Sequence, residues 1–270
     1  MATTARDSEI PAGSIRQDAW WVQPLLTVLV LGGFIVYATW RTFENAHFTT
    51  LGTDLFSSGR VGDLLSPFYS PHIAIDWKIL GYHVSPALLI LPFPLSFRLT
   101  CYYYRKAYYR SFFGKPAACG VPGSRNLFGQ YTGEKYWPMA FQNLHRFAFY
   151  AAFIFIFILA FDVYKSTHFI DGWGISVGTI VLLLNVVFLA AYTFGCHSWR
   201  HLIGGKIDCF SCSVMNKTRY GLWKKATVLN ENHQLWAWTS LFGVALTDLY
   251  IRLVTSGAIA DHIFFKVANG

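Results

Sequence analysis

The stretch that decides the fold is GWGISVGTIVLLLNVVFLAAYTFGCHSW, residues 172–199, which carries no formal charge over its whole length. An uncharged run of this length can cross the hydrocarbon of a bilayer with some tilt. Near its end, the segment from Cys196 to Cys212 holds three of the chain's five cysteines and two of its nine histidines. The sequence therefore predicts a membrane helix that ends at a group of metal-binding side chains.

The composition of the whole chain favours a polytopic membrane protein. Hydrophobic residues make up 54% of the 270 residues and charged residues only 13%, about half the usual share in a soluble domain. The net charge of +8 lies in the gaps between apolar runs, and no aromatic-and-basic nucleic-acid module is visible. Membrane lipid is therefore an expected partner, and nucleic acid is not. Five cysteines clustered toward one end of the helices do not suggest a disulfide framework.

Four further runs resemble the first one. We predict an all-α, polytopic membrane protein that forms one domain over residues 1–270. Its five transmembrane helices are expected at approximately 19–40, 79–97, 138–161, 172–199 and 232–250. The second run contains Pro86, Pro92 and Pro94, which should kink it or break it locally. Near the far end of the fifth run, Asp248 and Arg252 are expected to snorkel to the interface.

The positive charges fix the expected orientation. Fifteen Lys and Arg residues lie on the N-terminal side of the predicted spans and six on the opposite side. The excess of positive charge marks the cytoplasmic side, so the N-terminus is expected inside and the C-terminus outside. Residues 1–18 lack the basic start of a secretory signal, and no cleavage is expected there.

Under this topology, cysteines and histidines from four helix ends lie near the cytoplasmic face. They are Cys101, Cys119, His145, Cys196, His197, His201, Cys209, Cys212 and His233. Such side chains are costly in a membrane and tend to be functional. For any one of them an ordinary interfacial role is the simpler interpretation, whereas the set as a whole favours a metal centre.

Thiolates select zinc or iron–sulfur clusters, whereas histidines alone on facing helices would suggest a bis-His haem b. Cys209 and Cys212 form a Cys-x-x-Cys that can place both sulfurs on one iron, and His197 and His201 share a helix face. Two cysteines on one iron and two histidines on the other is the Rieske arrangement, although the usual Rieske loops are absent. The candidate ligands are His145, Cys196, His197, His201, Cys209 and Cys212. Zinc would satisfy the same residues, and one haem between His145 and His197 or His201 is a further alternative.

A candidate quinone site opens the last predicted span. His233 lies at the headgroup level, where it can donate a hydrogen bond to a quinone carbonyl and carry a proton. Trp236 can line a slot for the ring. An ordinary capped helix end with a satisfied histidine explains the same residues equally well.

Four pieces of the sequence resemble a known family: TCYYYRKAYYRS (100–111), QNLHR (142–146), GCHSWRHLIGG (195–205) and LTDLY (246–250). They are similar to the membrane-anchor subunit of succinate dehydrogenase, respiratory complex II, of the actinobacterial single-chain type. The similarity covers all but the N-terminus and the first outer loop, and the Cys-His-x-x-x-His segment at 196–201 is its most specific part.

This resemblance implies a five-helix anchor in the bacterial cell membrane, with a flavoprotein and an iron–sulfur subunit on its cytoplasmic side. Better-known relatives of this shape hold two haems with a histidine buried in the first helix, and the first predicted span has none. For the actinobacterial branch the resemblance implies a Rieske-type [2Fe-2S] cluster held by Cys and His instead.

We therefore expect the membrane-anchor and quinone-reducing subunit of a succinate:quinone oxidoreductase. Electrons would pass from the soluble iron–sulfur subunit through a membrane-embedded Rieske-type [2Fe-2S] cluster to quinone. The chain itself would bind no succinate, and the isolated subunit is not expected to be catalytic. The rival hypothesis is a zinc-stabilised membrane transport or structural protein that uses the same residues.

Overall fold

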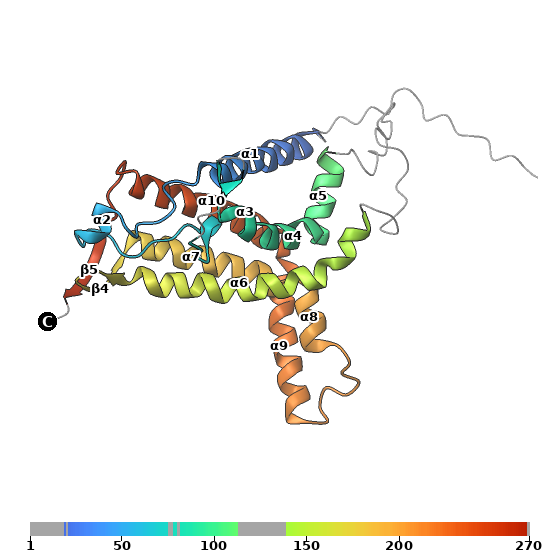
Figure 1. Cartoon of the computed structure of the whole chain (residues 1–270). Helices are drawn as coiled ribbons and strands as arrows, with labels where there is room; N and C mark the ends of the chain where they lie inside the picture. The colour runs from blue at the N-terminus through green and yellow to red at the C-terminus, as the bar shows by residue number, and fades with distance from the viewer. Residues whose placement is uncertain (1–18, 20, 75–77, 80–81, 113–138, 269–270) are drawn as a thin grey trace, which may run out of the picture.

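Four helices are long and apolar enough to cross a membrane. The computed structural model describes residues 19–112, except 20, 75–77 and 80–81, and residues 139–268. Within them, the candidate spans are α1 (Val22–Glu44), Ala140–Ser166, α7 (Val177–Phe194) and α10 (His233–Thr255). The second of these joins the 3-10 helix η2 (Met139–Leu144) to α6 (His145–Ser166). The long helices run side by side (Figure 1), as expected for a membrane bundle.

The predicted span at 79–97 is the part of the five-helix expectation that is not confirmed. Residues there form a short hairpin of β1 (Lys78–Ile79) and β2 (Tyr82–His83), then α3 (Ala87–Ile90) and α4 (Pro92–Thr100). The apolar helical stretch Ala87–Thr100 is too short to be a span by itself. Proline explains the interruption, because Pro92 has no N–H to continue the helix ladder and begins a new helix at its first turn.

The remaining helices lie at the two ends of the bundle. On one side are the short helix α2 (Asp54–Ser57) and the 3-10 helix η1 (Pro67–Tyr69). On the other are α5 (Tyr102–Phe112), α8 (His197–Gly204) and α9 (Val214–Glu231). In Figure 1, α8 and α9 run across the direction of the long helices.

The all-α expectation misses a small sheet at the end of the bundle opposite α8. There, β3 (His168–Phe169), β4 (Gly172–Ser176) and β5 (Ile263–Ala268) form an antiparallel sheet in the order β3-β4-β5. Glycine makes the close pairing possible, because a Cβ on Gly172 would lie 2.0 Å from the carbonyl oxygen of Val267. Ser176 ends β4 and begins α7 with a capping box, in which its side chain accepts from the backbone N–H of Thr179.

A buried polar network joins α1 to α10 near the sheet. Asp248 and Arg41 are both fully buried, with Nε of Arg41 2.7 Å from Oδ2 of Asp248. Glu44 accepts from both Arg41 and Arg252. The prediction that Asp248 snorkels to the interface is therefore wrong, because its charge is neutralised inside the protein instead.

Some expectations concern parts of the chain outside the described residues. They are the cytoplasmic N-terminus at 1–18, Cys119, and Pro138 as the start of the third span.

Candidate functional site

Four metal-binding side chains meet where four helices begin or end. Cys101 joins α4 to α5, and Cys196 joins α7 to α8. His145 is the first residue of α6, and His233 is the first residue of α10. They form two sulfur–imidazole pairs, with Cys196 Sγ 3.0 Å from His145 Nε2 and Cys101 Sγ 3.5 Å from His233 Nε2.

Both sulfurs lie in one apolar cluster. Cys101 and Cys196 are each 2% exposed and belong to the same group of buried residues as Phe97, Tyr104 and Tyr192. Aromatic rings hold the two imidazoles in place. Phe97 stacks on His145 at 5.0 Å between ring centroids, and Tyr192 stacks on His233 at 4.9 Å. The two sulfurs therefore share one apolar environment, and the stacked rings restrict the movement of the partly buried imidazoles.

Thr100 orients the ring of His145. The Thr100 hydroxyl donates to the carbonyl oxygen of Ser96 at 2.7 Å, so its lone pairs are left to accept. His145 Nδ1 lies 2.9 Å from that hydroxyl oxygen. This arrangement assigns the ring proton to Nδ1 and leaves the lone pair of Nε2 directed toward Cys196. A histidine that binds a metal through Nε2 is commonly oriented in this way by a partner on its other nitrogen.

A positive charge lies close to the pairs. The guanidinium of Arg98 lies 4.9 Å from the ring centroid of Tyr192, which also stacks on His233. It donates to the hydroxyl of Tyr104 at 2.6 Å and to the hydroxyl of Ser240 at 3.0 Å. Arg98 thus ties α4 to α5 and α10, and it places a cation beside a site that thiolates would make negative.

Burial keeps the Cys196 thiol protonated when no metal is bound. Loss of solvation is the main cause that raises its pKa to about 11, and nearby Cys101 raises it further. Metal ions displace the proton of a thiol when they bind. The buried pair therefore suits a metal ligand better than a free nucleophile.

Comparison with known proteins places this arrangement in a family. Residues 22–257 match the family model of the actinobacterial succinate dehydrogenase subunit SdhC. The chain belongs to this family. A chain of the Mycobacterium smegmatis Sdh1 complex in the apo form is similar in structure, with 38% sequence identity, a TM-score of 0.82 and 97% of each chain covered. No match was found among curated proteins. The resemblance inferred from the sequence is thereby confirmed.

In this membrane subunit, His197 and His201 contact each other on α8, directly after Cys196. Both are exposed on α8, and their Nε2 atoms lie 2.9 Å from each other. They share a helix face, as their spacing predicts. Partial burial lowers the pKa of His197, with smaller contributions from His201 and Arg200.

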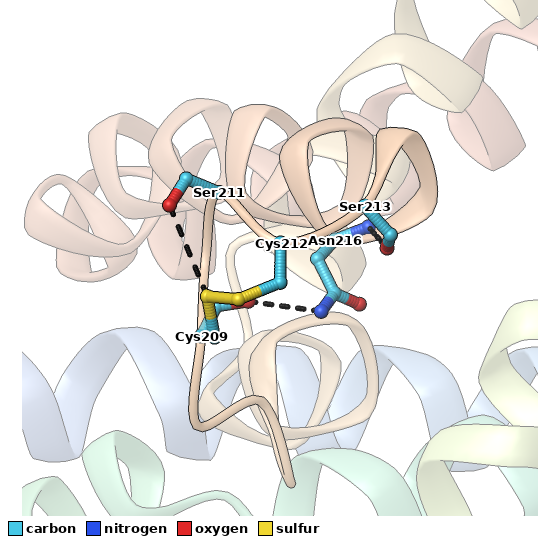
Figure 2. The surroundings of a disulfide bond; sticks show 5 residues. All are labelled: Cys209, Ser211, Cys212, Ser213 and Asn216. Carbon is cyan, nitrogen blue, oxygen red and sulfur yellow. Dashed lines mark hydrogen bonds between the residues drawn. A yellow bond between two sulfur atoms is a disulfide. The ribbon is translucent and has the colours of Figure 1, made fainter.

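Cys209 and Cys212 bond to each other in the loop between α8 and α9. Figure 2 shows the disulfide, with the side-chain amide of Asn216 donating to the carbonyl oxygen of Cys209 at 2.9 Å. Of the six predicted ligands, only His145 and Cys196 contact each other across separate helices. Cys101 was not among those predicted ligands. Its position at a helix end, like those of His145 and Cys196, was the available signal.

The two predicted quinone residues lie beside the pairs. Trp236 packs against the same apolar cluster. Its indole Nε1 and the Nδ1 of His233 are buried, and neither has a hydrogen-bond partner among the described residues. A separate apolar cavity of about 380 Å³ is lined by α1, α3, α4, α6 and α7, and reaches Phe97, Arg98 and Tyr192.

No group of three or more His, Cys, Asp or Glu residues in the described part of the chain surrounds a single ion position. The donors are arranged as two contacting pairs instead. Each pair joins one sulfur to one imidazole, so together they supply two thiols and two imidazoles.

Proposed function

We propose that this membrane subunit anchors a succinate-oxidising complex and takes part in its reduction of quinone. We further propose that Cys101, His145, Cys196 and His233 hold a Rieske-type [2Fe-2S] cluster. The observation that supports the proposal is the two Cys–His contacts, at 3.0 and 3.5 Å, whose sulfurs are both buried in one apolar cluster. This set replaces four of the ligands expected from the sequence, His197, His201, Cys209 and Cys212.

The residues fit such a group in type and number. Two thiols and two imidazoles are the donors of a Rieske centre, in which one iron has two Cys ligands and the other has two His ligands. When bound, the cluster would supply a one-electron carrier whose potential is raised relative to an all-Cys cluster, which suits delivery to quinone.

Neighbouring side chains have distinct tasks in this proposal. Thr100 holds the ring proton of His145 on Nδ1 and leaves Nε2 free to bind metal. Arg98 supplies a positive charge that opposes the negative charge of two thiolates. Phe97 stacks on the ring of His145 and Tyr192 on the ring of His233, which fixes both imidazoles. The orientation of His145 and the charge of Arg98 favour metal binding, whereas burial keeps the Cys196 thiol protonated until a metal displaces its proton.

Quinone is the proposed substrate at the same end of the bundle. The unpaired Trp236 N–H and the free nitrogen of His233 are the buried polar groups that a quinone carbonyl would satisfy. The apolar cavity that reaches Arg98 suits the hydrocarbon tail of a lipid-soluble molecule. His233 would then face the metal through Nε2 and carry a proton at Nδ1.

The partners and the orientation follow the charge distribution. We propose that the basic side, with the cysteines and histidines, faces the cytoplasm of a bacterium. There it would receive the iron–sulfur and flavoprotein subunits of succinate dehydrogenase. The chain offers no succinate-binding role in this scheme, and the isolated subunit would be inactive.

Electron paramagnetic resonance of the dithionite-reduced complex tests the proposal. We expect a rhombic signal of low average g, in addition to those of the soluble subunits. Four single variants should each abolish both that signal and quinone reduction: Cys101→Ser, His145→Ala, Cys196→Ser and His233→Ala. Each should leave succinate oxidation by an artificial acceptor unchanged.

Two matched variants control for the ligand assignment. The rhombic resonance signal should persist in two double variants, Cys209→Ser with Cys212→Ser and His197→Ala with His201→Ala. If these variants lose it and the four single variants keep it, the ligands are His197, His201, Cys209 and Cys212 instead. Stoichiometric zinc without the signal would end the redox proposal, and sharp visible bands on reduction would replace the cluster with haem b.

A further inference from the structure

The hairpin of α8 and α9 runs across the direction of the long helices. Figure 1 shows both helices running across the direction of the long helices, near the junction with α7 and α10. Arg219 on α9 fixes the hairpin by donating to the carbonyl oxygens of Ile203 and Gly205, each at 2.8 Å. Asn230 fixes α9 to the end of α7 by donating to the carbonyl oxygen of Gly195 at 2.8 Å. Because the long helices cross a membrane, a hairpin perpendicular to them extends along its surface.

α9 carries four large apolar side chains that no described residue covers. Val214 is 81% exposed, Met215 68%, Leu222 45% and Val228 62%. Met215 and Leu222 are seven residues apart, and Val214 and Val228 fourteen, so each pair is aligned along the helix. Ala226, in contrast, is only 3% exposed. Exposed large apolar side chains on a helix that is packed along another face favour contact with a second apolar environment.

The hairpin is also basic. Residues 197–231 contain six Lys and Arg residues and two acidic residues. Arg219 is engaged with the carbonyl oxygens of the hairpin, whereas Lys217, Lys224 and Lys225 are exposed. An amphipathic helix with exposed apolar and lysine side chains is typical of elements that lie in the interface of anionic membranes.

We propose that the α8–α9 hairpin is a membrane-surface element that binds anionic phospholipid. In this arrangement Val214, Met215, Leu222 and Val228 enter the boundary between headgroups and acyl chains. Lys217, Lys224 and Lys225 bind the headgroup phosphates. The adjoining surface of the bundle favours lipid, rather than a soluble protein, as the molecule that contacts the hairpin. Leu235, in the first turn of α10 immediately after α9, is 53% exposed on a membrane-spanning helix, so the lipid-facing surface continues directly onto the hairpin.

Photocrosslinking in the intact complex tests the position of the hairpin. The complex is reconstituted in nanodiscs of equal parts phosphatidylglycerol and phosphatidylcholine, with p-benzoylphenylalanine in turn at Met215, Leu222 or Lys217. Leu246, which is 61% exposed on α10, provides the lipid-facing reference. We expect phospholipid adducts at Met215, Leu222 and Leu246 by mass spectrometry, and at least a fivefold lower yield at Lys217. Adducts to a protein subunit at Met215 and Leu222, or no adduct there when Leu246 gives one, would overturn the proposal.

The ratio of the two lipids tests the role of the lysines. One lysine near a membrane surface attracts anionic lipid with an energy that corresponds to an enrichment of roughly fivefold. We expect phosphatidylglycerol to be enriched by at least that factor in the Leu222 adducts and not in the Leu246 adducts. The triple variant Lys217→Gln, Lys224→Gln and Lys225→Gln should remove this enrichment. The ratio of phosphatidylglycerol to phosphatidylcholine in its Leu222 adducts should then equal that of the nanodisc. An unchanged ratio would contradict headgroup binding by these lysines.

Discussion

Replacing Asp248 by Asn should destabilise the bundle strongly, because it removes the main counter-ion of a fully buried arginine. Asp248 accepts from Arg41 Nε at 2.7 Å and from Arg41 Nη2 at 3.3 Å. It also accepts from the hydroxyls of Tyr37 and Ser66, each at 2.5 Å. These contacts join α1, α10 and the segment before η1. Breaking one side of a buried ion pair costs about 3–5 kcal/mol.

Because Arg41 has a second acidic partner in Glu44, the expected loss of unfolding free energy lies at the lower end of this range. Glu44 also accepts from Arg41, and its side chain is 19% exposed, so Arg41 keeps one partly hydrated partner. We expect a loss of about 3 kcal/mol, which corresponds to a fall in melting temperature of about 6–12 °C for a chain of this size. Thermal unfolding of the purified complex, followed by intrinsic fluorescence, measures this change.

A double variant separates the buried charge from lost packing. Arg41→Met together with Asp248→Asn removes both charges, so it should be less destabilised than the sum of the two single variants by about 2 kcal/mol. Asp171→Asn is the exposed control, because Asp171 pairs with Lys266 with 55% of its side chain exposed, and little change is expected. A melting temperature of Asp248→Asn within about 2 °C of the unaltered complex would refute the reasoning. So would strict additivity in the double variant.

Three further changes test local features of the structure. Gly172→Ala should disrupt the pairing of β4 with β5 and expose the C-terminal strand to limited proteolysis, whereas Gly33→Ala, where a Cβ would meet nothing within 4 Å, should not. Ser176→Ala should lower stability by about 1 kcal/mol by removing the cap of α7, which a shift of the melting temperature measures. Arg98→Gln should lower quinone reduction more than succinate oxidation by an artificial acceptor, because it removes the cation beside the two Cys–His pairs. Arg98→Lys should restore part of the quinone activity, and equal loss of both activities would indicate failed assembly instead.

Much of the fold follows from hydrophobic run length alone. Four of the five predicted spans correspond to helices that can cross a membrane, because a bilayer demands long uncharged helices whatever their neighbours are. Run length fails at 79–97, where prolines set the helix boundaries and the uncharged stretch breaks into a hairpin and two short helices. The sheet was missed because its strands are two to six residues long and because β4 pairs with β5 across a separation of about ninety residues.

The sequence predicts the chemistry of the candidate site, but it does not predict which residues form it. Residue types and positions at helix ends indicate sulfur and imidazole donors near one face. The high density of Cys and His residues favoured the Cys196–Cys212 segment as the site. The observed contacts instead join residues that are far apart in sequence. His145 and Cys196 are separated by 51 positions, and Cys101 and His233 by 132. Such pairings depend on how α4, α6, α7 and α10 pack, which local spacing does not encode.

The two ends of the bundle handle buried polar groups in opposite ways. Near the sheet, Arg41 and Asp248 carry fixed charges that need each other whenever the chain is folded, because an isolated buried charge is costly. At the other end, a thiol and an imidazole can both stay uncharged, so a Cys–His pair can be buried without a counter-ion. The Cys196 thiol, with its pKa raised to about 11, gains a charge there only when a cation replaces its proton. The bundle can therefore fold with these side chains in place and uncharged, and in the proposed function a metal would meet ligands already held by Thr100, Phe97 and Tyr192.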